Sequence, residues 1–254
     1  TDRGRYSYVT RVGNWYEDMV LEDEKMRDFL EKKNKGTLTI QRIRQNMISV
    51  PVPPQPRHAP VKYGDLLRVV NGEYGCYLAC DPGDTENEEE HLYSATGSFE
   101  RETTSRNVWF LTLDSTNETT LDLGGDESEE GCVRYGDTVI LRTTDSIGDE
   151  PFYLCSHLQD WNHFSRASRK QPVCSTPTIT HQNAWTICAL SRRGDDEMDG
   201  EIVHFGDAVV LKHAQSLAPL AASDGQVIND YGSEHELIAG RLPGRRIVWQ
   251  FVAE

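Results

Sequence analysis

An all-β body preceded by an N-terminal arm with one helix is the fold that the sequence predicts. Three observations support it: a strand-forming motif that occurs three times, a tryptophan at a matched distance after each copy, and a proline-rich passage over residues 50–60. With 254 residues, the chain is long enough to bury a sizeable core. We expect an arm over residues 1–60 and a body over residues 61–254, with repeats 61–132, 133–202 and 203–254.

The arm contains a segment, about residues 17–35, that is typical of a solvent-facing helix. Acidic and basic side chains recur in it at i,i+4 spacing, and Gly36 stands where a C-terminal cap is expected. Met26, Phe29 and Leu30 form a narrow apolar stripe. Such a stripe is too thin to hold a helix by itself in water, so we expect the helix to dock on the body or on a partner; both alternatives stay open.

The passage between the arm and the body is rich in proline. Five prolines fall between Pro51 and Pro60, a density that forbids helix and favours a stiff, extended linker. The charge changes at the same place, from a net +3 over residues 1–60 to a net −18 over residues 61–254. We therefore predict a domain boundary at residue 60.

The composition excludes several classes of protein. The net charge of −15 argues against a nucleic-acid binder, which needs a basic surface. The aliphatic runs are too short to cross a bilayer, and the first fifteen residues lack the apolar core of a signal peptide, so we expect no membrane partner and a cytoplasmic location. The six scattered cysteines then favour reduced, buried thiols.

The body contains an internal repeat. A valine, any residue, an aromatic residue, glycine and aspartate precede an apolar strand three times, and the glycines are 72 and 70 residues apart. Gly-Asp before an apolar run is turn chemistry leading into a strand. A tryptophan follows each glycine after 45, 49 and 43 residues, and a side chain of that size at a matched place is a natural core anchor. We predict these structural positions: Gly64, Gly136, Gly206, Trp109, Trp185 and Trp249.

Three repeats of short strands must bury one another's apolar faces, and closure around a pseudo-threefold axis removes the sheet edges. These features predict a β-trefoil, in which each repeat contributes four strands. The fourth strand is expected near residues 92–96 and 226–230, with a weak signal in the middle repeat. A three-bladed array or another closed barrel is the alternative architecture.

The sequence offers no pattern for catalysis. It lacks phosphate-binding and nucleophile-elbow motifs, and His235-Glu236 lacks the second histidine of a zinc protease. We therefore expect no enzyme activity, no cofactor and no tightly bound metal. Acidic residues concentrate in three loops that we interpret as solvated rather than as calcium sites: residues 81–90, 122–130 and 194–201.

The arm carries a resemblance to a known family. Residues 11–15 (RVGNW), Glu17-Asp18, residues 28–32 (DFLEK) and Gly36 resemble the N-terminal signature of the cilia- and flagella-associated protein 161 family. The Tyr-Gly-Asp strands are similar too, and the body looks like an MIR-type β-trefoil.

The resemblance implies a non-catalytic microtubule inner protein of cilia and flagella. Such proteins line the lumen of the A-tubule in axonemal doublet microtubules, where they brace the tubulin lattice beside other inner proteins. We expect the arm to make the contact with α/β-tubulin, because tryptophan and arginine are common interface anchors. The expected contact residues are Arg11, Asn14, Trp15, Met26, Phe29 and Leu30.

A ligand- or sugar-binding trefoil of the MIR or ricin type is the alternative function. Ricin-type lectins carry a Gln-x-Trp repeat, but the residues two before the three tryptophans are Asn107, Asn183 and Ile247. The lectin pattern is therefore absent.

Overall fold

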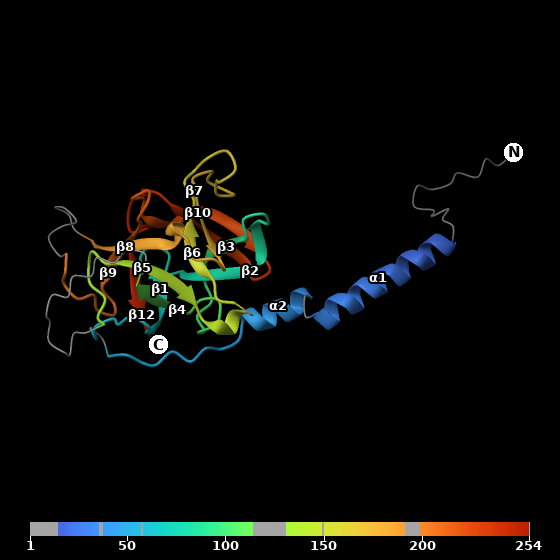
Figure 1. Cartoon of the computed structure of the whole chain (residues 1–254), viewed down its shortest axis with the longest axis horizontal. Coiled ribbons are helices and arrows are strands. Elements are labelled where there is room, and N and C mark those ends of the chain that lie inside the picture. Colours follow the sequence, from blue (N-terminus) through green and yellow to red (C-terminus); the bar gives the residue numbers. More distant parts are fainter. Residues whose placement is uncertain are drawn as a thin grey trace. The chain divides into compact units, whose positions relative to one another are not determined.

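The computed structural model describes residues 15–35, 38–56, 58–113, 131–148, 150–190 and 199–253. The chain divides into two compact units, Thr1–Arg42 and Ile43–Glu254 (Figure 1). Five features predicted from the sequence fall wholly or partly outside the described residues: Arg11, Asn14, Gly36 and the acidic loops 122–130 and 194–201.

The first unit contains helix α1, Trp15–Lys35, which begins two residues before the predicted start and ends at the predicted residue. Acidic residues occupy its first turn and lysines its last, which complements the helix dipole. Two i,i+4 ion pairs lie along it, Lys32–Asp28 at 2.9 Å and Lys35–Glu31 at 2.6 Å. Helix α2, Thr39–Asn46, follows. Neither described α-helix is both long and apolar enough to span a membrane.

The proline-rich passage belongs to the second compact unit, which begins at Ile43, before the predicted domain boundary at residue 60. The passage is extended, as expected, but it is not a free linker. Val50 and Val52 are buried against Val108, and the Val50 amide donates a hydrogen bond to the Thr103 carbonyl at 2.9 Å. The prolines predict the extended conformation, but the burial depends on the two valines, which lie on one side of the extended chain.

The described residues of the second unit form a 12-stranded antiparallel sheet. Two short 3-10 helices, η1 (Asp145–Ile147) and η2 (His181–Asn183), lie in its connections. The strands are β1 Leu66–Asn71, β2 Tyr77–Asn87, β3 Leu92–Ser98, β4 Trp109–Leu113, β5 Thr138–Thr143, β6 Tyr153–Ser156, β7 Gln171–Thr176, β8 Ala184–Ala189, β9 Ala208–His213, β10 Leu220–Asn229, β11 Gly232–Ala239 and β12 Trp249–Val252.

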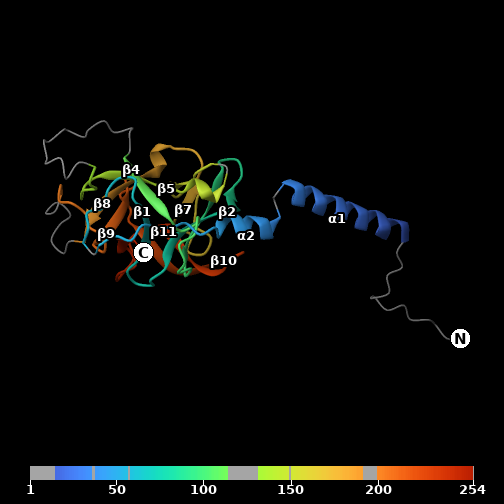
Figure 2. The same ribbon diagram turned by 90° about the horizontal axis from the view of Figure 1, so that it is seen from below.

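Six of the strands close into a ring. β1 pairs with β12 and with β4, and the circuit continues through β5, β8 and β9 back to β12. The other six form three hairpins, β2–β3, β6–β7 and β10–β11. One strand of each hairpin also pairs with a strand of the other two hairpins. These pairings are β3–β7, β3–β11 and β7–β11. Figures 1 and 2 show the ring strands gathered at one end of this unit and the hairpins at the other.

The three tryptophans occupy matching places in this architecture. Each is the first or second residue of a ring strand, and each side chain is fully buried. Each indole Nε1 donates a hydrogen bond to a leucine carbonyl on the preceding hairpin: Trp109 to Leu78 at 2.9 Å, Trp185 to Leu154 at 3.2 Å and Trp249 to Leu220 at 2.8 Å. The indoles therefore join the ring to the hairpins in every repeat.

The predicted position of the fourth strand is correct in the first repeat but wrong in the third. β3 covers residues 92–96, whereas residues 226–230 complete β10 and enter a turn. The additional strand is instead β11, after the turn at Gly232. β10 continues through an irregularity between Ala222 and Gln226, so the apolar residues after it do not start a new strand.

The motif glycines adopt backbone angles that favour glycine. Gly64, Gly136 and Gly206 have φ of 85°, 92° and 90° in the turns that precede β1, β5 and β9. A Cβ at Gly206 would meet nothing within 4 Å, so a substitution there acts through the backbone alone.

We predict that Gly206→Ala lowers the free energy of unfolding by about 1–2 kcal/mol, because an L-residue is strained at positive φ. Urea denaturation measures the change. Gly206→Asn is the control, since asparagine tolerates positive φ better than alanine, and it should cost less. An alanine variant as stable as the native chain would contradict the backbone argument.

A buried ion pair holds the hairpin end of the body. Arg106 is fully buried, and its guanidinium makes two parallel hydrogen bonds to the Glu234 carboxylate, at 2.8 and 2.9 Å. Thr96 and Asn229 donate to the same carboxylate at 2.6 and 2.7 Å. The Tyr231 ring lies 3.7 Å from the guanidinium carbon. The pair therefore links the loop before β4 with β3, β10 and β11.

Candidate functional site

The structure describes the side chains of only some of the predicted contact residues of the arm. Arg11 and Asn14 lie outside the described residues. Trp15 is the first residue of α1, but its side chain is also outside the description. Met26, Phe29 and Leu30 are described, and each is about half exposed.

The apolar stripe of α1 is longer than the sequence analysis proposed. Met19, also about half exposed, lies seven residues before Met26, which places it on the same side of a helix with 3.6 residues per turn. The α1 stripe therefore consists of Met19, Met26, Phe29 and Leu30. The two ion pairs of α1 fall on the opposite side by the same geometry. The apolar stripe and the two ion pairs therefore lie on different sides of α1.

The body has its own exposed aromatic anchor, which the sequence analysis missed. Trp161, in the connection between β6 and β7, is 84% exposed, and Leu158 nearby is about half exposed. The connection is well ordered by polar contacts: the Asp160 carboxylate accepts hydrogen bonds from the amides of Asn162 and His163, at 2.7 and 2.8 Å. An exposed indole on a fixed loop is a common interface anchor.

The first acidic segment, residues 81–90, forms the second half of β2 and the turn after it, and it contacts the same connection. Asp84 accepts two hydrogen bonds from the Arg166 guanidinium, at 2.7 and 2.8 Å, and Glu86 accepts a third at 2.9 Å. Glu90 accepts one from His163 Nε2 at 2.9 Å. The interpretation of residues 81–90 as a purely solvated loop is therefore wrong, because half-buried cations from the middle repeat neutralise part of it.

The two histidines of this connection differ in their expected charge. Burial lowers the pKa of His157, and the neighbouring His163 lowers it further. Burial also opposes protonation of His163, but hydrogen bonds with Asp160 and Glu90 outweigh it and raise the pKa of His163. The rings stack with centroids 4.8 Å apart. The arrangement suits a neutral His157 beside a cationic His163.

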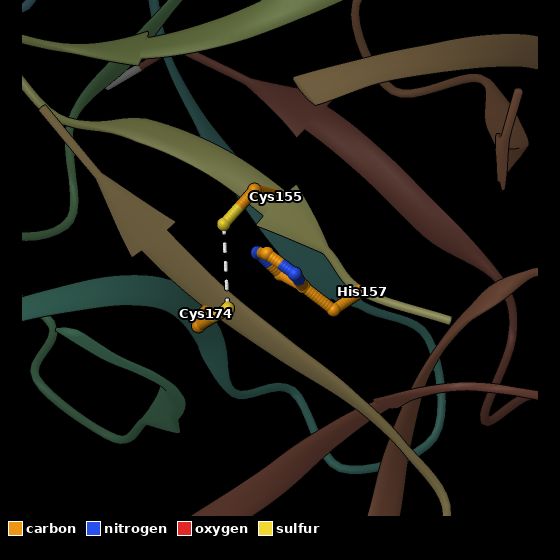
Figure 3. A group of neighbouring side chains, drawn as sticks. All are labelled: Cys155, His157 and Cys174. Carbon is orange, nitrogen blue, oxygen red and sulfur yellow. Dashed lines mark hydrogen bonds between the residues drawn. The ribbon is translucent and has the colours of Figure 1, made fainter. Parts of the chain in front are cut away.

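Two groups of described side chains have the composition and spacing to hold a metal ion. One is Cys155, His157 and Cys174, and the other is Glu90, His157 and His163; the ligand atoms of each group lie within 4.8 Å of one another. Figure 3 shows the His157 imidazole beside the two sulfur atoms, which are 3.3 Å apart. The first group could not be recognised from sequence spacing, because Cys155 and Cys174 are brought together by the pairing of β6 with β7.

The body also contains a cavity of about 370 Å³ near the buried ion pair. Arg106, Tyr231 and Glu234 contribute to its lining. The charged groups of Arg106 and Glu234 already satisfy each other, so they present little hydrogen-bonding capacity to a ligand.

Solved structures with similar folds support the all-β description. An SDF2-like protein from Arabidopsis thaliana superposes with a TM-score of 0.58 at 18% identity, covering 76% of this chain and 95% of its own. A Caenorhabditis elegans protein of unknown function gives 0.54 at 15% identity, covering 78% and 97%. The Pmt1-Pmt2 protein O-mannosyltransferase complex of S. cerevisiae gives 0.58 at 17% identity, covering 78% of this chain and 26% of the other. At these identities the likeness concerns the fold alone.

The similar sequences match over nearly the whole chain. No protein-family model matches it. Cilia- and flagella-associated protein 161 of Mus musculus is 29% identical over 92% of this chain and 81% of its own length. The proteins of the same name from Danio rerio and Bos taurus are 24% and 25% identical, over 92% of this chain and 81% and 76% of theirs. None of these names denotes a catalytic activity. The chain is therefore similar, over 92% of its length, to the cilia- and flagella-associated protein 161 of three vertebrates.

Proposed function

We propose that the chain is a non-catalytic structural protein of the ciliary or flagellar axoneme, a microtubule inner protein that binds α/β-tubulin in the A-tubule lumen of doublet microtubules and stabilises the lattice. The observation that carries this proposal is the similarity over 92% of the chain to cilia- and flagella-associated proteins. Neighbouring inner proteins are the other partners we propose.

We also propose that the body is a β-trefoil of MIR type. Three hairpins, a six-stranded ring and three matching indole hydrogen bonds support this architecture. Its role is that of a rigid block which presents loops to neighbouring proteins.

The α1 stripe is the tubulin contact that we propose for the arm, together with Arg11, Asn14 and Trp15. An apolar side with charged residues opposite is the usual form of a helix that docks into a groove. The ion pairs on α1 are exposed, so each contributes at most about 1 kcal/mol, and the apolar contact supplies most of the affinity. Trp161 on the body is a second contact, and two tethered contacts bind more tightly than either alone.

Removal of residues 1–42 tests this function, because the second unit begins at Ile43 and keeps its own core. The full chain, expressed in a flagellated host, should remain in axonemes after a salt wash, whereas the truncated chain should be largely extracted. A variant with Met26→Asp and Leu30→Asp should behave like the truncation, since it places charge on the stripe.

The matched control is Asp28→Asn with Glu31→Gln, which changes the opposite side of α1 and should leave retention nearly intact. If the full chain does not enter axonemes, the proposed function is wrong. If the truncated chain is retained as well as the full chain, the arm is not the anchor.

A further inference from the structure

We propose that Cys155, His157 and Cys174 bind a zinc ion on the β6–β7 hairpin, with Glu90 orienting the histidine. The two cysteines lie directly opposite each other in the register of β6 and β7. All three side chains are buried, and their candidate ligand atoms lie within 4.8 Å of one another. Thiolate sulfur and imidazole nitrogen are the ligands that zinc prefers.

The spacing fits a tetrahedral site after a small adjustment. Zinc–sulfur and zinc–nitrogen bonds of about 2.3 and 2.0 Å place ligand atoms about 3.5–3.8 Å apart. The two sulfur atoms are 3.3 Å apart, so they would separate by about half an ångström. The imidazole projects toward them from the end of the same hairpin strand (Figure 3). The three side chains supply three of the four ligands of a tetrahedral zinc ion.

The outer contacts match those of a metal-bound histidine. His157 Nδ1 lies 3.7 Å from the Glu90 carboxylate, just beyond hydrogen-bond distance, so a small movement of Glu90 would close the contact and leave Nε2 for the metal. A carboxylate behind a metal-bound imidazole fixes its tautomer and raises its basicity. Glu90 is in turn held by His163 Nε2 at 2.9 Å.

The other two repeats provide an internal comparison. The leucine carbonyls that accept the indole hydrogen bonds align the repeats, so the next residues, Ala79, Cys155 and Ala221, occupy equivalent positions. Their partners across the hairpins are Thr96, Cys174 and Ile238. Two cysteines face each other in the middle hairpin alone, and His157 stands where the others have Asp81 and Ser223. Hairpins of this fold therefore do not need the cysteines for packing.

Metal binding also has a structural consequence for the Trp161 connection. The site lies where that connection leaves β6 and re-enters the sheet through β7. Zinc would displace one proton from each thiol and join the two ends of the connection with metal–ligand bonds. The exposed indole would then be held more rigidly for docking.

Cobalt(II) titration of the full, reduced chain tests the proposal, because thiolate ligation gives cobalt a sulfur-to-metal charge-transfer absorption. We expect this absorption to saturate at one equivalent and to disappear when zinc is added. The double variant Cys155→Ala, Cys174→Thr copies the first repeat, so it should fold, and it should give no such absorption. Cys188→Ser, which changes a buried cysteine of β8 outside the group, should titrate like the native chain.

Affinity for zinc gives a second readout. Glu90→Gln should weaken zinc binding about 10- to 100-fold, the usual effect of losing an outer-shell carboxylate. Three results would each overturn the site: no charge-transfer absorption with the native chain, an unchanged titration of the double variant, or a Cys155–Cys174 disulfide in protein isolated from cytoplasm under thiol-trapping conditions.

Discussion

Trp249→Ala is expected to lower the free energy of unfolding by about 3–5 kcal/mol, because a fully buried indole leaves a cavity that a closed ring cannot collapse around. The variant also leaves the Leu220 carbonyl without the indole hydrogen bond of 2.8 Å. Because that carbonyl is buried between the ring and a hairpin, its loss of a partner adds to the cost. Urea denaturation followed by circular dichroism measures the effect.

The matched control is Trp161→Ala, which removes an indole that is 84% exposed and should change stability by less than about 0.5 kcal/mol. Because the three repeats are equivalent, Trp109→Ala and Trp185→Ala should lower the free energy of unfolding by an amount in the same range as Trp249→Ala. Equal effects of the Trp161 and Trp249 variants would count against the buried hydrogen-bonded role of the indoles.

Arg106→Met should destabilise the chain by about 3–5 kcal/mol, since it leaves the Glu234 carboxylate buried without its cation. The second substitution, Glu234→Leu, should restore much of the loss, because removing both charges ends the desolvation penalty. Arg166→Ala, in a half-exposed ion pair with Asp84, is the control and should cost about 1 kcal/mol or less. If Arg106→Met is no worse than Arg166→Ala, the buried pair is not a stabilising link.

The same pair predicts a pH dependence. Burial alone would raise the pKa of Glu234, but hydrogen bonds and charge from Arg106 outweigh it and lower the pKa from 4.5 to about 2. A carboxylate with a lowered folded-state pKa contributes stability above pH 4.5, and that contribution is lost as the pH falls toward 2. The Arg106→Met, Glu234→Leu variant should therefore lose less stability than the native chain between these pH values. Equal losses would contradict the assignment.

Local and repeated features of the fold were predictable from the sequence. The presence of α1 and its C-terminal end follow from i,i+4 charge pairs, which depend on neighbours a single turn away. The motif glycines and the tryptophans were predictable because each occurs three times, so chance could be discounted. The coarser all-β class followed from the short apolar runs after each glycine.

Features that depend on distant residues were not predictable. The Asn46 side chain donates a hydrogen bond of 2.6 Å to the Tyr231 hydroxyl, 185 residues away, and nothing near Asn46 in the sequence signals that contact. α2 was missed for a related reason: eight residues carry little periodic signal, and the prolines that follow suggested a linker. The paired Cys155 and Cys174 also become neighbours only through strand register.

The pairing of β1 with β12 has a consequence for biosynthesis. The two strands are about 180 residues apart in the chain, yet they lie side by side in the ring, with Arg68 opposite Val252 and Asn71 opposite Trp249. While residues 249–252 are still inside the ribosome, β1 exposes one unpaired edge and the apolar interior lacks its third indole. Partly made chains are therefore open to aggregation, and contacts of such high sequence separation slow closure. A nascent-chain protease assay should find the body sensitive until β12 emerges and protected soon afterwards.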